Sequence, residues 1–336
     1  MSAALGVAVA GLGVGAAHGR AYLATGKCRL GWLYDLDEDK ARALAAELGA
    51  GKVARHFEEI LEDPETQVVS IASYDDAHFG QVVAALEAGK HVFVEKPLCR
   101  GAGELDVIKR AWSRHGGRLK LGTNMVLRKA PLYAWIRENV RAGRFGRLYA
   151  FDGDYLYGRL GKITEGWRAR VENYSVIEGG GIHLIDLMLW LTGERPESVY
   201  VTGNRIATEN TPFRYPDYVA AHLRFASGLV GRVTANFGCV HPHQHVVRLF
   251  GTEGALVHDD AGARWHRTRD PARGASRVGF AALPAGKGVW IGDFVDSVLS
   301  DADLSSSTQE SFDAISICAA CDRSLKTGKE EEVLYA

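Results

Sequence analysis

The chain has 336 residues, of which 46% are hydrophobic and 24% are charged, values typical of a globular protein rather than a disordered one. Its 40 Lys and Arg residues balance 41 Asp and Glu residues, so the net charge of −1 provides no basic surface for nucleic acid or for an anionic membrane. The N-terminal segment lacks a basic start and no run of about 18 apolar residues follows it, so we expect a cytoplasmic protein without a signal peptide or a membrane span.

Short apolar segments alternate with helical patterns in the first third of the chain. Because the apolar segments show no polar face, they predict strands that are buried on both sides. This alternation is typical of βαβ units, so we expect an α/β domain with a parallel sheet over residues 1–122. The expected strands are residues 6–10, 30–34, 68–72, 91–94 and 119–121, and the expected helices are residues 16–25, 37–48, 77–88 and 104–114.

From residue 123 to residue 336 the pattern changes to alternating or aromatic segments separated by turn residues. It predicts an α+β domain with a mostly antiparallel sheet. The expected helices are too few to cover both faces of that sheet, so we expect an uncovered face to bind a second copy of the chain. The expected strands are residues 198–202, 218–225, 229–237, 246–250 and 255–258, and the expected helices are residues 131–140, 182–191, 292–299 and 308–325.

A glycine-rich segment, Gly11-Leu-Gly-Val-Gly-Ala16, follows the first expected strand and opens the first helix. Such glycines let the backbone approach a pyrophosphate at the N-terminus of the helix. Asp35, 24 residues after Gly11, ends the second strand, where its carboxylate can accept bonds from the adenosine ribose. It would repel a 2′-phosphate, and Leu36 supplies no compensating Arg, so NAD is favoured over NADP. The cofactor-binding residues expected here are Gly11, Gly13, Val14, Gly15 and Asp35.

Two further clusters contain candidate catalytic residues. Glu95-Lys96-Pro97 lies at the carboxyl end of the strand expected at residues 91–94, where open α/β sheets bind ligands. Glu178-Gly-Gly-Gly181 precedes the helix expected at residues 182–191, and the glycines leave room for a bulky group. His183 and Asp186 share one face of that helix. We expect His183 to lie in its first turn, where the helix dipole disfavours imidazolium and leaves a neutral proton acceptor.

Together, the segment from Gly11 to His18, Asp35, residues 85–98 with Glu95-Lys96-Pro97, and the segment from Gly179 to Asp186 resemble the Gfo/Idh/MocA oxidoreductase family. The resemblance covers nearly the whole chain. It implies a Rossmann domain followed by a domain whose open sheet forms dimers or tetramers. It also implies NAD(P)-dependent oxidation or reduction of a sugar, nucleotide sugar or cyclitol, with Lys96 and His183 as the catalytic residues.

The same resemblance suggests further site residues. Candidates for catalysis or substrate binding are Glu178, Asp186, Tyr155, Arg168, Asn124 and Arg128, and candidates for cofactor binding are Ser73, His78, Glu95, Lys96, Trp167 and Arg168. The resemblance also shows a departure: many family members carry Asp four residues before the catalytic His, where this chain has Gly179, and the adjacent Glu178 is a candidate to replace it. Tyr74 also stands where a Pro often follows the fourth strand.

Two other functions fit the same pattern. One is NAD-dependent glycoside hydrolysis, in which the cofactor is recycled, and the other is a non-catalytic regulator that binds a dinucleotide. The presence of both Lys96 and His183 speaks against the regulator.

Two histidine and cysteine patterns suggest metal or redox chemistry, and we assign neither. The imidazoles of His241-Pro-His243-Gln-His245 alternate and would share one strand face, but zinc needs a further ligand, so a sheet surface or substrate wall is favoured and no metal is expected. Cys318-Ala-Ala-Cys321 lies within a late helix rather than at the start of one, which indicates buried structural cysteines.

Overall fold

A computed structural model describes residues 4–336, which fold into two units. The first unit contains the chain up to Val126 together with Pro284–Phe312, and the second contains Leu127–Leu283 together with Asp313–Tyr335. A single boundary at residue 122 therefore does not describe the chain. After Leu283 the chain returns to the first unit, because Ile291, Phe294 and Val295 complete the hydrophobic core of that unit.

The first unit is a Rossmann fold, as expected from the alternation of strands and helices. Its six parallel strands have the order β3-β2-β1-β4-β5-β6. They are β1 (Leu5–Ala10), β2 (Cys28–Tyr34), β3 (Lys52–Val53), β4 (Val68–Ile71), β5 (His91–Val94) and β6 (Leu121–Thr123). The helices are α1 (Gly15–Ala24), α2 (Glu38–Leu48), α3 (Phe57–Glu62), α4 (His78–Glu87), α5 (Gly101–Ser113) and α9 (Ile291–Leu299).

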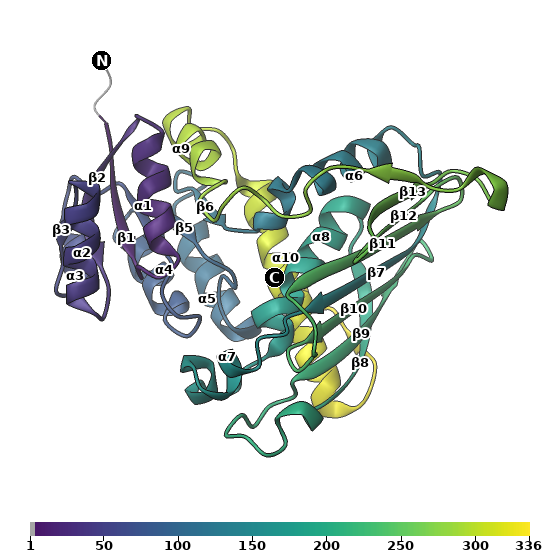
Figure 1. Ribbon diagram of the computed structural model, residues 1–336. Coiled ribbons are helices and arrows are strands. Elements are labelled where there is room, and N and C mark those ends of the chain that lie inside the picture. The colour runs from purple at the N-terminus through teal and green to yellow at the C-terminus, as the bar shows by residue number, and fades with distance from the viewer. Residues whose placement is uncertain (1–3) are drawn as a thin grey trace. The chain divides into compact units, whose positions relative to one another are not determined.

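Helices cover both faces of this sheet, since every residue of β1 is buried. Helix α1 packs against α9, and α4 packs against α5 (Figure 1). Helix α2 begins where the Asp37 side chain accepts a bond from the Lys40 N–H, and it ends at Gly49, whose φ of 60° lies in the left-handed region.

The second unit contains a nine-stranded sheet of order β14-β13-β12-β11-β7-β10-β9-β8-β15. Only β7 and β10 are parallel, and the other neighbours are antiparallel, as expected. The strands are β7 (Leu148–Leu156), β8 (Pro196–Asn204), β9 (Tyr218–Phe225), β10 (Val230–Asn236), β11 (Gln244–Gly251), β12 (Ala255–Asp259), β13 (Gly262–His266), β14 (Ser276–Val278) and β15 (Glu331–Glu332).

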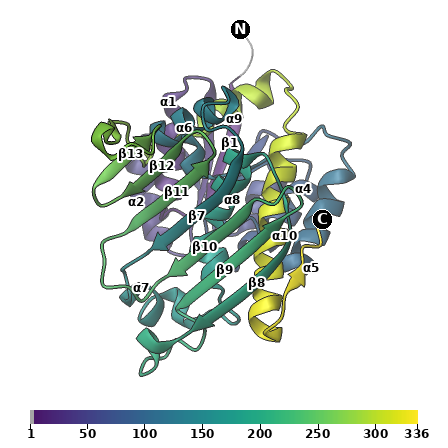
Figure 2. The same ribbon diagram turned by 90° about the vertical axis from the view of Figure 1, so that its right-hand side faces the viewer.

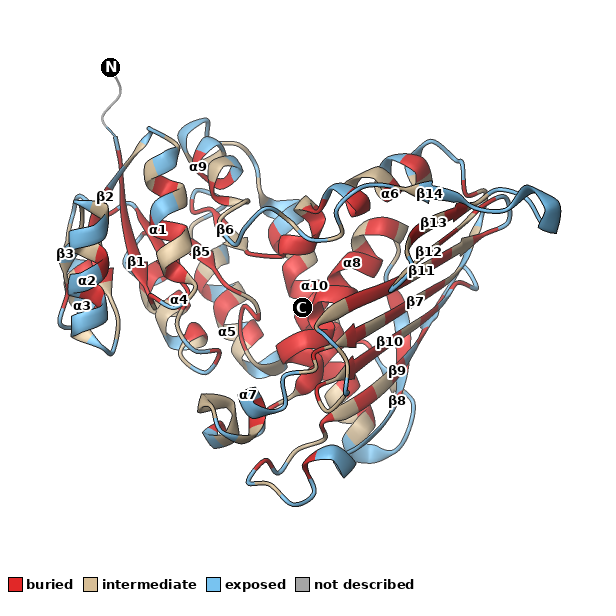
Figure 3. Cartoon of the chain, in the orientation of Figure 1, coloured by how far each residue is buried: buried red, intermediate tan, exposed pale blue. Residues whose placement is uncertain are grey.

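The helices of the second unit lie on one face of this sheet. Helix α8 packs against β7 and β10 and also contacts α6. Figure 2 looks onto the opposite face of β7 to β13, which no helix of residues 4–336 covers. The α-helices are α6 (Pro131–Arg141), α7 (Gly161–Thr164) and α8 (Ile182–Thr192), and α10 (Ser305–Thr327) continues into this unit. Nearly all of α8 is buried (Figure 3). Among residues 4–336, no helix is both long enough and apolar enough to cross a membrane.

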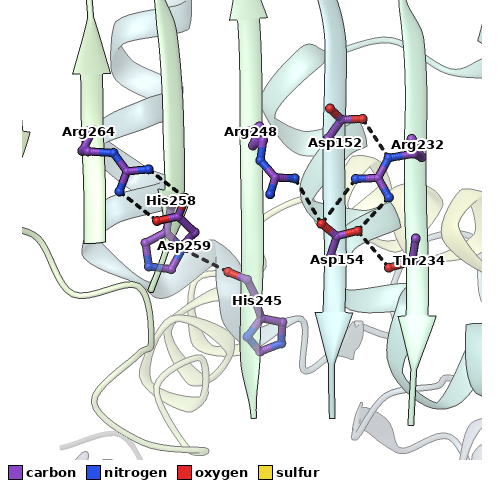
Figure 4. Close-up of polar contacts among 9 residues, drawn as sticks. All are labelled: Asp152, Asp154, Arg232, Thr234, His245, Arg248, His258, Asp259 and Arg264. Atoms are coloured by element: carbon purple, nitrogen blue, oxygen red, sulfur yellow. Dashed lines mark hydrogen bonds and ion pairs between the residues drawn. The ribbon is translucent and has the colours of Figure 1, made fainter. Parts of the chain in front are cut away.

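Strand β7 forms the middle of the sheet, although its sequence did not predict a strand. Its buried residues alternate with Asp152 and Asp154, which lie on the open face. Arg232 bonds both aspartates, and Arg248 bonds Asp154 at 3.1 Å (Figure 4). Burial raises the pKa of Asp154, but the bonds from Arg232, Thr234 and Arg248 lower it further, so its pKa lies below the ordinary value. The charges in the middle of this open face are therefore neutralised within the sheet.

The cysteines fit a structural role rather than a redox role. The described residues form no disulfide, and Cys318 and Cys321 are both buried on α10.

Candidate active site

The glycine-rich loop between β1 and α1 is shaped to hold a dinucleotide. Gly11 has a φ of +81°, and a Cβ atom on it would lie 2.2 Å from the main-chain nitrogen of Ser73, so only glycine fits. A Cβ on Gly13 would meet nothing closer than the Lys40 Nζ at 4.0 Å, so the outer side of the loop is open. The loop leads through Val14 into the N-terminus of α1, whose main-chain N–H groups favour a pyrophosphate.

Asp35 follows β2 beside this loop. Its Oδ2 accepts bonds from the Leu12 N–H at 2.6 Å and from the Lys40 ammonium at 3.0 Å. Burial raises the pKa of Asp35, but hydrogen bonds from the Leu12 and Asp37 N–H groups and from Lys40 outweigh it, so the pKa lies below the ordinary value. The ionised carboxylate fits an adenosine ribose. The sequence analysis did not predict this bond from Lys40, which lies five residues after Asp35.

Glu95 and Lys96 follow β5, at the same end of the sheet as the glycine-rich loop. Glu95 is buried, and its Oε1 lies 3.2 Å from the His18 Nε2 and 2.6 Å from the Asn124 Nδ2. Burial raises the pKa of Glu95, but its bonds with His18 and Asn124 lower it further, so this carboxyl group remains ionised. His18 also bonds Ser70 of β4 at 3.0 Å. These contacts fix the residue that precedes the half-buried Lys96.

The other candidates in this unit have structural contacts. His78 is completely buried, with its Nδ1 2.7 Å from the Pro97 carbonyl oxygen and its Nε2 3.2 Å from that of Ser73. It therefore supports the loop after Lys96 rather than presenting its ring to a cofactor. Ser73 donates its hydroxyl hydrogen to Gln81. The Asn124 side chain is also completely buried and donates to the Glu95 carboxylate.

In the second unit, three glycines admit aromatic and aliphatic side chains next to the helix that carries His183. A Cβ at Gly180 would lie 2.3 Å from the Tyr155 ring, and one at Gly181 would lie 2.6 Å from the Ile177 side chain. No real Cβ atom lies so close to another atom. The Tyr155 and Ile177 side chains therefore approach these glycines closely, as expected from the sequence. The glycines belong to a π-helical turn, η3 (Ile177–Gly181), which runs directly into α8.

This turn corrects one expectation about His183. The side chain lies more than a turn inside a continuous helical segment rather than in its first turn. Because the dipole field falls off within the first turn, it does not by itself keep this imidazole neutral.

His183 is part of a cluster of rings. Its ring stacks on that of Tyr155, with centroids 6.1 Å apart, and meets the His245 ring edge to face at 5.7 Å. Tyr155 also stacks on Tyr157 at 5.8 Å, and His243 lies 5.0 Å from His245. Such a wall of rings suits the apolar face of a sugar ring.

The histidine pattern at residues 241–245 divides between two places. His245 lies on β11 opposite Tyr155, on the face that packs against the helices. His241 instead lies before the strand, 3.1 Å from Asp260, and its bonds with the Pro242 carbonyl and with Asp260 raise its pKa. The three imidazoles therefore do not share one strand face. Residues 4–336 contain no group of His, Cys, Asp and Glu that is arranged to hold a metal.

The remaining candidates of the second unit have contacts of their own. Arg128 follows the first unit in the 3-10 helix η1 (Val126–Lys129) and bonds both carboxylate oxygens of Asp186, with its Nε 2.9 Å from Oδ2. Both side chains are buried, so the pair anchors α8. Glu178 is also buried, and its N–H donates to the Ser175 hydroxyl at 3.3 Å. Arg168, in the 3-10 helix η2 (Trp167–Arg170), lies over the Trp167 ring.

Known proteins match both units. Two family profiles match the chain: that of the oxidoreductase family with an NAD-binding Rossmann fold over residues 5–123, and that of the GFO/IDH/MocA C-terminal domain over residues 133–257. Levoglucosan dehydrogenase of Pseudarthrobacter phenanthrenivorans is 25% identical over 76% of this chain and 73% of its own length. Myo-inositol 2-dehydrogenase of Thermotoga maritima is 26% identical over 76% and 75%.

Solved structures have the same fold. The structure of levoglucosan dehydrogenase in complex with NADH has a TM-score of 0.88 at 23% identity, and the match covers 99% of this chain and 100% of that one.

Proposed function

The chain belongs to the Gfo/Idh/MocA family of oxidoreductases, and from this premise we propose that it is an NAD-dependent dehydrogenase or reductase. Its substrate is a secondary alcohol, or the corresponding ketone, of a sugar, nucleotide sugar or cyclitol. The observation that carries this proposal is the position of Lys96, directly after β5 in the unit that holds the glycine-rich loop and Asp35. The relatives named above act on levoglucosan and on myo-inositol, which supports this substrate class.

The residues of the first unit fit NAD, which when bound accepts or supplies a hydride. Gly13 leaves room for the pyrophosphate, whereas Gly11 and Gly15 let the loop pack closely against Ser73 and Val9. Asp35 binds the adenosine ribose. We propose a preference for NAD over NADP, because an ionised Asp35 repels a 2′-phosphate. Lys40 is bonded to that carboxylate, and this bond offsets part of its attraction for a second anion.

Lys96 and His183 divide the chemistry at the reacting oxygen. The ammonium group of Lys96 binds that oxygen and stabilises the negative charge that develops on it. The imidazole of His183 takes the hydroxyl proton during oxidation and returns it during reduction. Tyr155 holds the His183 ring by stacking, and the cluster of rings offers an apolar wall to the sugar ring.

Turnover assays test this division of roles. NADH formation is measured spectroscopically with a panel of sugars and cyclitols. We expect His183→Ala to lower kcat at least about a hundredfold while NAD affinity stays nearly unchanged, and Lys96→Ala to lower kcat further. His241→Ala is the matched control, since this imidazole is bonded to Asp260 away from the ring cluster. Full turnover by His183→Ala would contradict the proposal, as would release of the phenol from an aryl glycoside without net NADH formation.

We also propose that the open face of the second unit's sheet forms a homodimer or homotetramer. Val230 and Tyr200 lie on this face with 52% and 44% of their surfaces exposed. Because Arg232 and Arg248 already neutralise Asp154, a second copy can cover the face without burying an unpaired charge.

A further inference from the structure

Helix α10 contacts the helical segment that carries His183 at the point where this segment begins. The segment starts at Val176, passes through the π-helical turn η3 and continues as α8. Ser175 precedes it and acts as its N-cap, because the Ser175 hydroxyl oxygen accepts the Glu178 N–H at 3.3 Å. The same hydroxyl group donates its hydrogen to the Asp322 Oδ1 of α10 at 2.8 Å. Asp322 therefore orients the cap of the segment.

A second contact from α10 reaches the π-helical turn itself. The sulfur of Cys318, one helical turn before Asp322, lies 4.0 Å from the Ile177 carbonyl oxygen. This carbonyl also accepts the Ile182 N–H, in a bond that spans five residues rather than the four of an α-helix. The two contacts thus hold η3 just before its start and at a bond that defines it as a π turn.

The π turn determines where the His183 ring lies. It contains one residue more than an α-helical turn, so it rotates every following residue by about 100° relative to a regular helix. The same turn brings Gly180 against the Tyr155 ring, on which the His183 ring stacks with centroids 6.1 Å apart. A change in the turn would therefore move the His183 imidazole relative to Tyr155.

The Asp322 carboxyl group lies in a place that disfavours its charge. Burial raises its pKa to about 6, although the bond from Ser175 lowers it. Shifted pKa values of this kind gather at functional sites, where a group is kept for its role despite its effect on stability. An apolar side chain would fill the same place without that effect, so the carboxylate points to a role for its bond to Ser175.

We propose that Asp322 is a positioning residue for the proton transfer at His183, because it fixes the start of η3 through the Ser175 hydroxyl and thereby the place of the imidazole. The carboxylate acts through the Ser175 cap and takes no proton from the substrate. Its effect therefore falls on kcat rather than on the binding of cofactor or substrate. This inference rests on the proposed function, because it concerns the residue that holds the proposed proton acceptor.

Substitutions at position 322 separate this role from a merely structural one. Asp322→Leu removes the acceptor of the Ser175 hydroxyl hydrogen, whereas Asp322→Asn retains an oxygen that accepts it. We expect Asp322→Leu to lower kcat about three- to tenfold, the effect of one hydrogen bond, with KM and the affinity for NADH unchanged. Asp322→Asn should keep kcat near that of the unchanged protein. Because both variants remove the ionised carboxylate, urea denaturation at pH 7 should show no common loss of stability.

The matched control is Asp303→Leu. Asp303 likewise accepts a serine hydroxyl hydrogen, that of Ser305, at 2.9 Å. This bond lies at the start of α10, about 25 Å from Asp322 along the helix. We therefore expect Asp303→Leu to leave kcat unchanged.

NMR of the protein with ¹³C-labelled histidine observes the His183 ring directly, without cofactor or substrate. The His183 signal is identified by its loss in His183→Ala. We expect Asp322→Leu to shift this signal, and Asp322→Asn and Asp303→Leu to leave it in place. Ser175→Ala should shift it as well. Asp322→Leu combined with Ser175→Ala should have no further effect, because both substitutions remove the same bond.

An unmoved His183 signal or an unchanged kcat in Asp322→Leu would overturn this inference, and so would an equal loss of kcat in Asp322→Asn. Absence of NAD-linked turnover of every sugar and cyclitol by the unchanged protein would refute the proposed function instead. The NMR signal would then decide by itself whether Asp322 positions the His183 ring, since that measurement requires no turnover.

Discussion

We expect the ionised Asp322 side chain on α10 to destabilise the folded protein at neutral pH. Ser175 donates its hydroxyl hydrogen to the Asp322 Oδ1 at 2.8 Å, and the Glu178 N–H donates to the Ser175 oxygen. Burial raises the pKa of Asp322 from an ordinary 3.8 to about 6, although the bond from Ser175 lowers it. The folded chain therefore binds more protons than the unfolded chain between about pH 4 and pH 6, and the free energy of unfolding falls as the pH rises through this window.

The magnitude follows from the shift in pKa. Each unit corresponds to about 1.4 kcal/mol, so a shift of about two units makes the ionised carboxylate cost up to about 3 kcal/mol at pH 7. Asp322→Asn removes the charge and leaves an oxygen that accepts from Ser175. We expect this variant to be more stable than the unchanged protein by about 1–3 kcal/mol at pH 7, with the gain vanishing near pH 4.

Urea denaturation followed by Trp fluorescence at several pH values measures this difference. Asp313→Asn is the control on the same helix. Asp313 forms an ion pair with Arg195, so its neutralisation should lower the stability at pH 7. A loss of stability in Asp322→Asn at pH 7, or a gain that does not depend on pH, would refute the reasoning.

Four further predictions concern the cofactor, the core and the open face. Asp35→Ser should weaken NAD binding and narrow the preference over NADP in fluorescence titrations, and equal binding of both cofactors by the unchanged protein would contradict the assignment. Arg128→Leu should cost about 3–5 kcal/mol in urea denaturation because it removes the cation that is paired with the buried Asp186 carboxylate, whereas removing both charges should cost less. Gly180→Ala should cost about 1–3 kcal/mol and lower kcat, since its methyl group meets the Tyr155 ring, and wild-type kinetics would refute this steric assignment. Val230→Asp should lower the mass measured by light scattering, and a monomeric unchanged protein at micromolar concentration would rule out the proposed interface.

The first sheet was predictable because its strands obey one simple rule. Buried parallel strands are continuous apolar segments, and five of the six were separated by helical patterns and turn residues such as Gly49. The short edge strand β3, Lys52-Val53, and helix α3 were not expected, since β3 is neither apolar nor buried. Strand β7 failed this rule because Asp152, Gly153 and Asp154 disfavour strands. Its stability depends on Arg232 and Arg248, which are distant in sequence, and such partners cannot be seen in a local pattern.

The residues of the candidate site were predictable only in part. The family resemblance made Lys96 and His183 candidates, and their catalytic roles remain a proposal, but it did not indicate the groups that hold them in place. His18 was visible in the motif without a role, because its contacts with Ser70 and Glu95 join residues 52 and 77 positions apart. The close approach of the Tyr174 hydroxyl to Gly179 could not be predicted either, because the sequence shows only that residue 179 has no side chain.

The discontinuous first unit has a consequence for how the protein is made. The ribosome completes all six strands of its sheet long before it synthesises Phe294, which lies against Phe93 at a ring distance of 5.2 Å. Until α9 emerges, the newly made sheet exposes the apolar surface that this helix later covers. A fragment that ends at Val126 should therefore aggregate, whereas the same fragment joined through a short linker to residues 284–312 should remain in solution.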